Sequence, residues 1–159
     1  MNIDYTDSEI QALIAEEKVL PTGFFHTLIN LKPVNKHVES KLSIVGSNGN
    51  HFVVILRKNR INSLDFSVIL SVEKPNSNQV FILRRYNGKS HPHTNRIEGN
   101  RFYNFHIHEA TERYQLRGMN PEGYAYETDR YNNFEEAILC LLSDCGFKKP
   151  DSDQPELFS

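Results

Sequence analysis

The feature that most constrains the fold is an Asn48-Gly49 pair between two strand-like runs, HVESKLSIVG and HFVVILRK. Asn-Gly in this setting is the strongest short-range signal of a two-residue hairpin loop, because both residues accept the positive φ angles that such a loop requires. The sequence therefore predicts an antiparallel hairpin here. The expected facing pairs are Ile44 with Val53, Leu42 with Ile55, and Ser40 with Arg57.

Further strands are expected downstream of this hairpin. The run LDFSVILSV alternates with period two, and QVFILRRYNG follows it after the polar turn KPNSN. The run RFYNFHIHE predicts a strand with two unlike faces, because successive side chains point to opposite sides of a sheet. Tyr103, Phe105 and Ile107 share the apolar face, and Asn104, His106 and His108 share the polar face.

Helices are expected near both ends of the chain. TDSE at 6–9 matches a capping box and predicts a helix over 7–19. NNFEEAILCLLSDCGF predicts a second helix, with Asn133 as its N-cap, Glu136 at N3 and Gly146 at C′. The spacing of the two cysteines inside this helix fits neither a redox pair nor a zinc pair, which favours core packing for both.

These elements predict an α+β domain: an antiparallel sheet of about five to six strands, with the N-terminal and C-terminal helices packed on one face. Residues 1–147 are expected to form one domain, and the polar residues 148–159 a disordered tail. The polar, acidic N-terminus does not resemble a secretory signal. No run approaches the roughly 18 apolar residues that span a bilayer. A cytoplasmic protein without a membrane partner is therefore expected.

Four of the chain's seven histidines form two H-x-H pairs, His91 with His93 and His106 with His108. In a strand, His106 and His108 lie on one side with Cα atoms roughly 6.5–7 Å apart, so their rings are able to converge on one small object. His91 and His93 precede them on a Pro- and Gly-containing loop that is long enough to fold back over the strand.

Three interpretations of the histidines remain open. Neutral imidazoles, with Glu109, Glu112 or water, would hold zinc or a similar ion. Without metal, one histidine would act as base and another as acid on a phosphate ester, while arginines stabilise the phosphoryl charge. Alternatively, the histidines are struts that tie the loop to the sheet, because buried polar groups need hydrogen-bond partners.

The charge distribution favours an anionic ligand. The net charge is −2, yet residues 32–117 carry fourteen Lys or Arg against six Asp or Glu. A basic middle suits nucleic acid, although the same side chains also solvate exposed strand faces. The arginines would repel a cation, so neither metal nor another cofactor is expected. The expected catalytic residues are His91, His93, His106 and His108, and the expected phosphate-binding residues are Arg57, Arg60, Arg84 and Arg85.

The run RRYNGKSHPHTN, the strand FYNFHIH and the terminal NNFEEAILCLL resemble a small uncharacterised bacterial family that shares a P-H-T-N loop and an H-I-H strand. These motifs are matched here at 92–95 and 106–108. More distantly, the order of an arginine-tyrosine strand end, an H-P-H loop and an H-x-H strand is similar to TumE-type toxins of bacterial toxin–antitoxin pairs. The resemblance implies a small cytoplasmic toxin with a cognate antitoxin. The functional residues that it implies for this chain are those in the shared motifs, His91, His93, His106 and His108.

The tail carries a separate motif. QPELF at 154–158 resembles the Q-x-x-L-F peptides that bind the bacterial sliding clamp. In that interpretation Gln154, Leu157 and Phe158 would bind the partner, because two apolar anchors on a disordered tail suit a partner's pocket. The alternative is an ordinary frayed terminus.

Two functions are therefore expected from the sequence. The first is a toxin-like or mobile-element protein that acts on nucleic acid, RNA in particular, through a His/Arg face, by metal-independent cleavage in its enzymatic form. The second is a non-catalytic binding module, an inhibitor or adaptor that recognises a protein partner, in which the histidines are struts.

Overall fold

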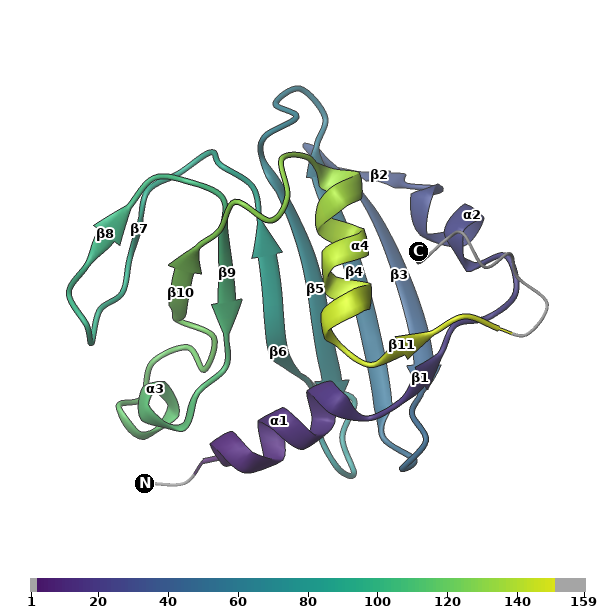
Figure 1. The fold of residues 1–159 in the computed structure, drawn as a ribbon, viewed down its shortest axis with the longest axis horizontal. Coiled ribbons are helices and arrows are strands. Elements are labelled where there is room, and N and C mark those ends of the chain that lie inside the picture. The colour runs from purple at the N-terminus through teal and green to yellow at the C-terminus, as the bar shows by residue number, and fades with distance from the viewer. Residues whose placement is uncertain (1–2, 151–159) are drawn as a thin grey trace.

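Residues 3–150, the part of the chain that the computed structural model describes, form a seven-stranded antiparallel sheet with helices against one face (Figure 1). The expected α+β class is confirmed, although the sheet has more strands than the expected five or six. The spatial order is β10, β9, β6, β5, β4, β3, β2. The strands are β2 (Lys32–Val34), β3 (His37–Val45), β4 (His51–Asn59), β5 (Phe66–Glu73), β6 (Val80–Asn87), β9 (His106–Glu109) and β10 (Tyr124–Glu127).

Short elements complete the chain outside this sheet. β1 (Lys18–Val19) pairs in parallel with β11 (Phe147–Lys148), which brings the two ends of the domain together. β7 (His93–Thr94) and β8 (Arg101–Phe102) form a small hairpin beside β10 (Figure 1). The helices are α1 (Asp7–Ala15), α2 (Phe24–Ile29), α3 (Glu112–Leu116) and α4 (Phe134–Asp144).

The core lies between the sheet and helices α1 and α4. α4 packs over β5 and β6, and α1 lies across one end of the sheet (Figure 1). Buried residues of both helices, such as Ile10 and Leu141, belong to one apolar cluster with Val68 and Leu70 of β5. Burying a side chain of this size stabilises the fold by about 1.5–3 kcal/mol. The expectation that both terminal helices cover one face is therefore confirmed.

The expected caps of α4 are confirmed. The Asn133 side chain accepts a hydrogen bond from the backbone N–H of Glu136 at 2.8 Å. After the C-cap residue Cys145, Gly146 takes the left-handed conformation with φ +76°, which a residue with a side chain rarely adopts. Cys140 and Cys145 are buried and unbonded to each other, as expected for core residues.

Helix α1 begins as expected but ends before the expected residue 19. Thr6 accepts from the N–H of Glu9, and the Glu9 side chain accepts from the N–H of Thr6, which completes the capping box. The helix ends at Ala15 because Lys18 turns back beneath it and closes its last turn. The Lys18 ammonium donates, at 2.7–3.0 Å, to the carbonyls of Leu13, Ile14, Glu16 and Cys145.

The hairpin forms at Asn48-Gly49, but its expected register is wrong by one residue. The Gly46 N–H donates to the Asn50 carbonyl, and Gly49 takes φ +88°, so the loop has three residues rather than two. The Glu16 carboxylate holds this loop by accepting from the Asn48 N–H and the Asn50 side chain. The facing pairs are consequently Ile44 with Phe52, Leu42 with Val54, and Ser40 with Leu56.

Strand β6 contains an irregularity that decides which arginine reaches the polar face. Leu70 of β5 pairs with Arg84, whereas the next residue, Ser71, pairs with Ile82, so Leu83 is an extra residue in β6. Such a bulge reverses the alternation of the residues that follow it. Arg84 therefore points to the helix-covered face and Arg85 to the opposite one.

The run RFYNFHIHE is not one continuous strand as expected. Arg101 and Phe102 pair with β7, the chain bends at Asn104, and β9 begins at His106. The side chain of Asn104 accepts from the N–H of Phe105, which stabilises the bend. The expected division of faces nevertheless holds in β9.

The sheet face opposite the helices carries the polar row that leads to the site. Pairing across the strands aligns Arg57 of β4, Ser67 of β5, Asn87 of β6 and His106 of β9. Within residues 3–150, no helix has the length and apolar character needed to cross a bilayer. Lys148, expected to begin the tail, is the last residue of β11, whereas Gln154, Leu157 and Phe158 lie outside the described residues.

Candidate functional site

Three of the four histidines chosen from the sequence form one cluster. The His93 ring lies 5.6 Å from the ring of His106 and 4.7 Å from that of His108, and the last two are 5.0 Å apart, centre to centre. His106 and His108 come from β9, while β7 brings His93 over them. The fourth, His91, is exposed and lies at the rim of the site.

Asn95 fixes the position of His93. Its Nδ2 donates to the Ala125 carbonyl at 2.7 Å, and its Oδ1 accepts from the Ala125 N–H at 2.8 Å. Because that backbone N–H is always a donor, the amide orientation of Asn95 is determined. His93 Nε2, 2.9 Å from the same Oδ1, must therefore carry the proton, which leaves Nδ1 unprotonated in the neutral ring.

His106 and His108 are held in the other tautomer. Nδ1 of His106 lies 2.7 Å from the Asn104 carbonyl, and Nδ1 of His108 lies 2.8 Å from the Glu122 carbonyl. A carbonyl only accepts, so both Nδ1 atoms carry protons and both Nε2 atoms are unprotonated in the neutral rings. In each ring of the cluster, one nitrogen therefore donates a hydrogen bond to the protein, and the other nitrogen keeps its lone pair in the neutral form.

Burial keeps both strand histidines uncharged at neutral pH. His106 is 6% exposed and His108 9% exposed. Burial, together with the neighbouring His106 and His93, lowers the pKa of His108 to about 3. Burial also lowers the pKa of His106, against the effect of the Asn104 carbonyl that accepts its proton. Their Nε2 atoms are therefore unprotonated near pH 7 and are able to accept hydrogen bonds.

A chain of side-chain contacts orients His106 across the sheet. The Ser67 hydroxyl donates to Asn87 Oδ1 at 2.9 Å. This leaves the Asn87 amide nitrogen as a donor, and it lies 3.5 Å from Nε2 of His106, at the long limit of a hydrogen bond. Each group in this chain donates to the next, from the Ser67 hydroxyl through Asn87 and His106 to the Asn104 carbonyl. Every contact therefore favours the tautomer of His106 that is protonated at Nδ1.

Arg85 is the basic side chain that stands beside this cluster. It pairs with His108 across β6 and β9, and its side chain is 29% exposed. Its guanidinium faces the Glu122 carboxylate at 3.8 Å, and its buried Nε has no hydrogen-bond partner. Burial lowers the pKa of Arg85, with nearby Arg57 acting in the same direction and Glu122 against it. The five donors of this guanidinium are incompletely used.

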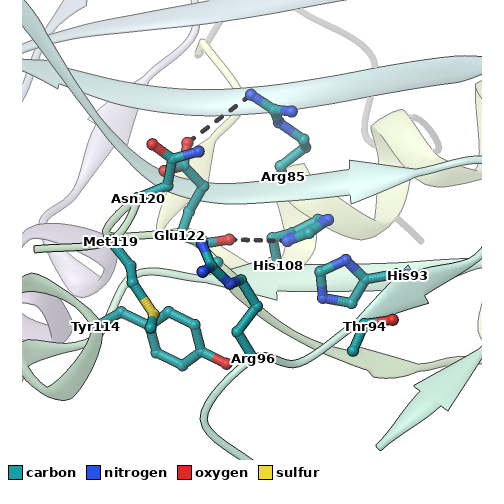
Figure 2. Close-up of a pocket in the computed structure, with 10 residues that line it drawn as sticks. Arg85, His93, Thr94, Arg96, His108, Tyr114, Met119, Asn120 and Glu122 are labelled. Carbon is teal, nitrogen blue, oxygen red and sulfur yellow. Dashed lines mark hydrogen bonds and ion pairs between the residues drawn. The ribbon is translucent and has the colours of Figure 1, made fainter. Parts of the chain in front are cut away.

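Two hollows lined by described residues adjoin the cluster, and His93 and His108 line both. The first, which we call the Arg85 hollow, has a volume of about 300 Å³. Figure 2 shows Glu122 at this hollow, joined to Arg85 through its carboxylate and to His108 through its carbonyl. Its other lining residues include Arg96, Tyr114, Met119 and Asn120.

The second, which we call the Asn87 hollow, has a volume of about 260 Å³. It adds His106 to the two shared histidines, and no lysine or arginine lines it. Its polar lining is completed by Asp65, Ser67, Asn87, Ser90 and His91.

The four arginines chosen from the sequence are not brought together. Arg85 lines the site, and Arg57 shares its face but pairs with Glu39 at 3.0 Å. Arg60 is exposed beyond β4. Arg84 lies on the helix-covered face, where it pairs with Glu109 at 3.5 Å and Asp144 at 3.8 Å, away from the histidines.

Sequence reasoning missed Asn87, Arg96 and Glu122 as site residues. Asn87 was detectable from the sequence, because it directly follows the Arg-Arg-Tyr at the end of the strand. It lies two residues after Arg85, so the two side chains share one face of the sheet. Arg96 and Glu122 come from irregular segments, and no periodic pattern predicts where such segments approach a sheet.

The arrangement does not favour a metal centre. Within residues 3–150, no group of three or more His, Cys, Asp or Glu side chains is arranged to hold a metal ion. Arg85 also faces the histidine cluster and would repel a cation. No family of known proteins, no curated protein and no solved structure matches the chain significantly.

Proposed function

We propose that the histidine cluster is the active site of a metal-independent ribonuclease. The observation that carries this proposal is the gathering of three imidazoles, each with one unprotonated nitrogen, beside the incompletely paired Arg85. Lone pairs near neutral pH supply general bases, and a guanidinium stabilises charge on a phosphoryl group. The basic middle of the sequence would attract a polyanion to this face.

The chemistry follows from which nitrogens are unprotonated. His93 would take the proton of a ribose 2′-OH at Nδ1, and the 2′-oxygen would attack the adjacent phosphorus. The bond from phosphorus to the 5′-oxygen breaks, and that oxygen receives the proton back from the cluster. The products are a 2′,3′-cyclic phosphate and a 5′-hydroxyl. His108, with a pKa of about 3, is too weak a base for the first step and would instead accept a hydrogen bond from the substrate.

The choice of base gives His93 the central role. His93 is half-buried and borders both hollows, whereas His106 and His108 are buried. A bound phosphate would favour the protonated form of a neighbouring imidazole, because opposite charges stabilise each other. A bound phosphate would therefore help the cluster to hold the proton taken from the 2′-OH until the 5′-oxygen receives it.

The test is incubation of purified protein with labelled single-stranded RNA and with DNA of the same sequence, with and without EDTA. We expect cleavage of RNA alone, unaffected by EDTA, with cyclic phosphate ends. His93→Ala and the double variant His106→Ala/His108→Ala should lose activity, while His51→Ala, which changes an exposed histidine on β4, should retain it. Cleavage of DNA, loss of activity in EDTA, or full activity of His93→Ala would contradict the mechanism.

A second candidate function is a protein-binding module in which the histidines only brace the fold. It is favoured by the backbone carbonyls of Asn104 and Glu122, which accept from His106 and His108 as struts would require. In that case wild type cleaves no RNA, and partner capture survives His93→Ala. Circular dichroism of each variant separates this outcome from simple unfolding.

A further inference from the structure

We propose that the two hollows divide one ribonucleotide between them: the Arg85 hollow takes the phosphate, and the Asn87 hollow takes the nucleoside. This assignment names how the substrate of the proposed ribonuclease lies, and so it rests on that function. Its central claim, an anion subsite at Arg85, is measurable without any cleavage.

The unmet donors of Arg85 point to an anion. Its Nε is buried without a partner, and the only ion pair of its guanidinium among the described residues is the long one with Glu122, 3.8 Å. The Nε of Arg84 is likewise buried without a partner, but the side chain of Arg85 is 29% exposed and lines the hollow, so its remaining donors are accessible to a ligand acceptor. A phosphate oxygen is the acceptor that best matches the planar fork of a guanidinium.

Arg96 supplies a second positive charge to the same hollow. It comes from the turn between β7 and β8 and lines the hollow together with Arg85. Within residues 3–150, Arg96 makes no ion pair and no side-chain hydrogen bond. The hollow is thus lined by two guanidiniums and one carboxylate, and the resulting net positive charge suits a phosphate.

Glu122 occupies this hollow as an internal competitor. Its carboxylate faces Arg85 where a phosphate oxygen would bind, while its backbone carbonyl holds His108. These two roles are separable, because replacing the carboxylate leaves the carbonyl in place. A phosphate would displace the carboxylate from Arg85 without releasing His108.

The Asn87 hollow has the opposite character. Without a lysine or arginine, and with the Asp65 carboxylate in its lining, it is unfavourable for a phosphate. Its amide and hydroxyl groups, on Asn87, Ser67 and Ser90, instead match the hydroxyls of a ribose and the edge of a base. Because His93 and His108 border both hollows, the bond between nucleoside and phosphate would lie against these two rings.

The experiment is an NMR titration with inorganic phosphate, which follows the arginine Nε–H and histidine ring signals of protein labelled with ¹⁵N. We expect shifts at Arg85, His93 and His108. Arg85→Gln should weaken phosphate binding by about tenfold or more, since it removes a charge-assisted contact. Glu122→Gln should strengthen it several-fold. The matched control Arg101→Gln, an exposed arginine of β8 outside both hollows, should change little.

A parallel titration with adenosine or uridine, which lack phosphate, should shift His106 and the Asn87 side-chain amide and leave Arg85 unchanged. The backbone spectrum of each variant shows whether it remains folded. Phosphate binding that is equal in wild type and folded Arg85→Gln, or weaker binding in Glu122→Gln, overturns the subsite. If phosphate binds as expected but RNA stays intact, the ribonuclease fails and the anion subsite stands.

Discussion

Asn95 forms two hydrogen bonds with the backbone of Ala125, one in each direction, as a neighbouring β-strand would. The side chain is 1% exposed and also contacts His93. A single amide therefore attaches the β7–β8 hairpin to β10 and sets the position and tautomer of the histidine that completes the cluster. The P-H-T-N motif of the sequence ends on this residue.

Asn95→Ala should consequently separate His93 from the other two rings. The variant leaves the Ala125 N–H and carbonyl without their partner, which should lower the free energy of unfolding by about 2–3 kcal/mol. RNA cleavage should fall to the level of His93→Ala. Urea denaturation and the cleavage assay measure the two effects.

The matched control is Asn100→Ala, which removes an exposed partner of Asn95 at 3.1 Å and leaves both contacts to Ala125. This substitution should lower the free energy of unfolding by less than about 1 kcal/mol. If Asn95→Ala is as stable and active as Asn100→Ala, the amide does not position His93.

The low pKa of His108 makes stability depend on pH in a defined window. The unfolded histidine binds a proton near pH 6.5, while the folded one does so only near pH 3. Between these values the unfolded state holds more protons, so stability falls as the pH falls. The slope from His108 approaches about 1.4 kcal/mol per pH unit, and His106 adds to it in the same direction.

Urea unfolding at pH 7.5, 6.5, 5.5 and 5.0 measures this slope before most carboxylates titrate. His108→Gln should reduce the slope to the part that His106 contributes, since the amide does not titrate. His37→Gln, at a histidine on β3, which is separated from β9 by β6, β5 and β4, is the matched control and should keep the wild-type slope. A wild-type stability that is flat from pH 6.5 to 5.0 would show that His108 accepts a proton in the folded state.

The parts of the fold that sequence predicts well are those decided by neighbouring residues. The capping box at Thr6 and the Asn133 cap depend on contacts three residues apart, and both are present. The hairpin at Asn48-Gly49 was predictable in place but not in register, because its loop is held by Glu16 from a distant helix end. The early end of α1 likewise depends on Cys145, far along the chain.

The site also has parts that neighbouring residues decide and parts that distant residues decide. The shared face of His106 and His108 follows from the period of a strand. His93 joins them through the β7–β8 hairpin, a return that the length of the loop allows but does not require. The choice of Arg85 over Arg84 depends on the bulge at Leu83, which the alternation of QVFILRRYNG does not signal. Glu122 reaches the cluster only through the tertiary arrangement of the segment before β10.

The bulge predicts unlike roles for two adjacent arginines. Arg84→Gln removes a largely buried charge from Glu109 and Asp144 and should lower the free energy of unfolding by about 2–4 kcal/mol. Its folded fraction should bind RNA as wild type does. Arg85→Gln should have the reverse profile, with a small change in stability and much weaker binding. Urea denaturation and fluorescence anisotropy with labelled RNA distinguish them, and equal loss of binding in both variants would contradict the assignment of faces.

Lys18 should matter more for stability than any exposed lysine, because its ammonium is completely buried and joins the ends of α1 and α4. It also lies 4.4 Å from the centre of the Phe52 ring, a favourable position for a cation. Lys18→Met keeps the length of the side chain but leaves four carbonyls without their donor, and it should lower the free energy of unfolding by about 3 kcal/mol. Lys41→Met, at an exposed lysine of β3, should change it by less than about 0.5 kcal/mol. Chemical denaturation of both variants tests this, and a Lys18→Met protein as stable as wild type would mean that the helix ends need no shared donor.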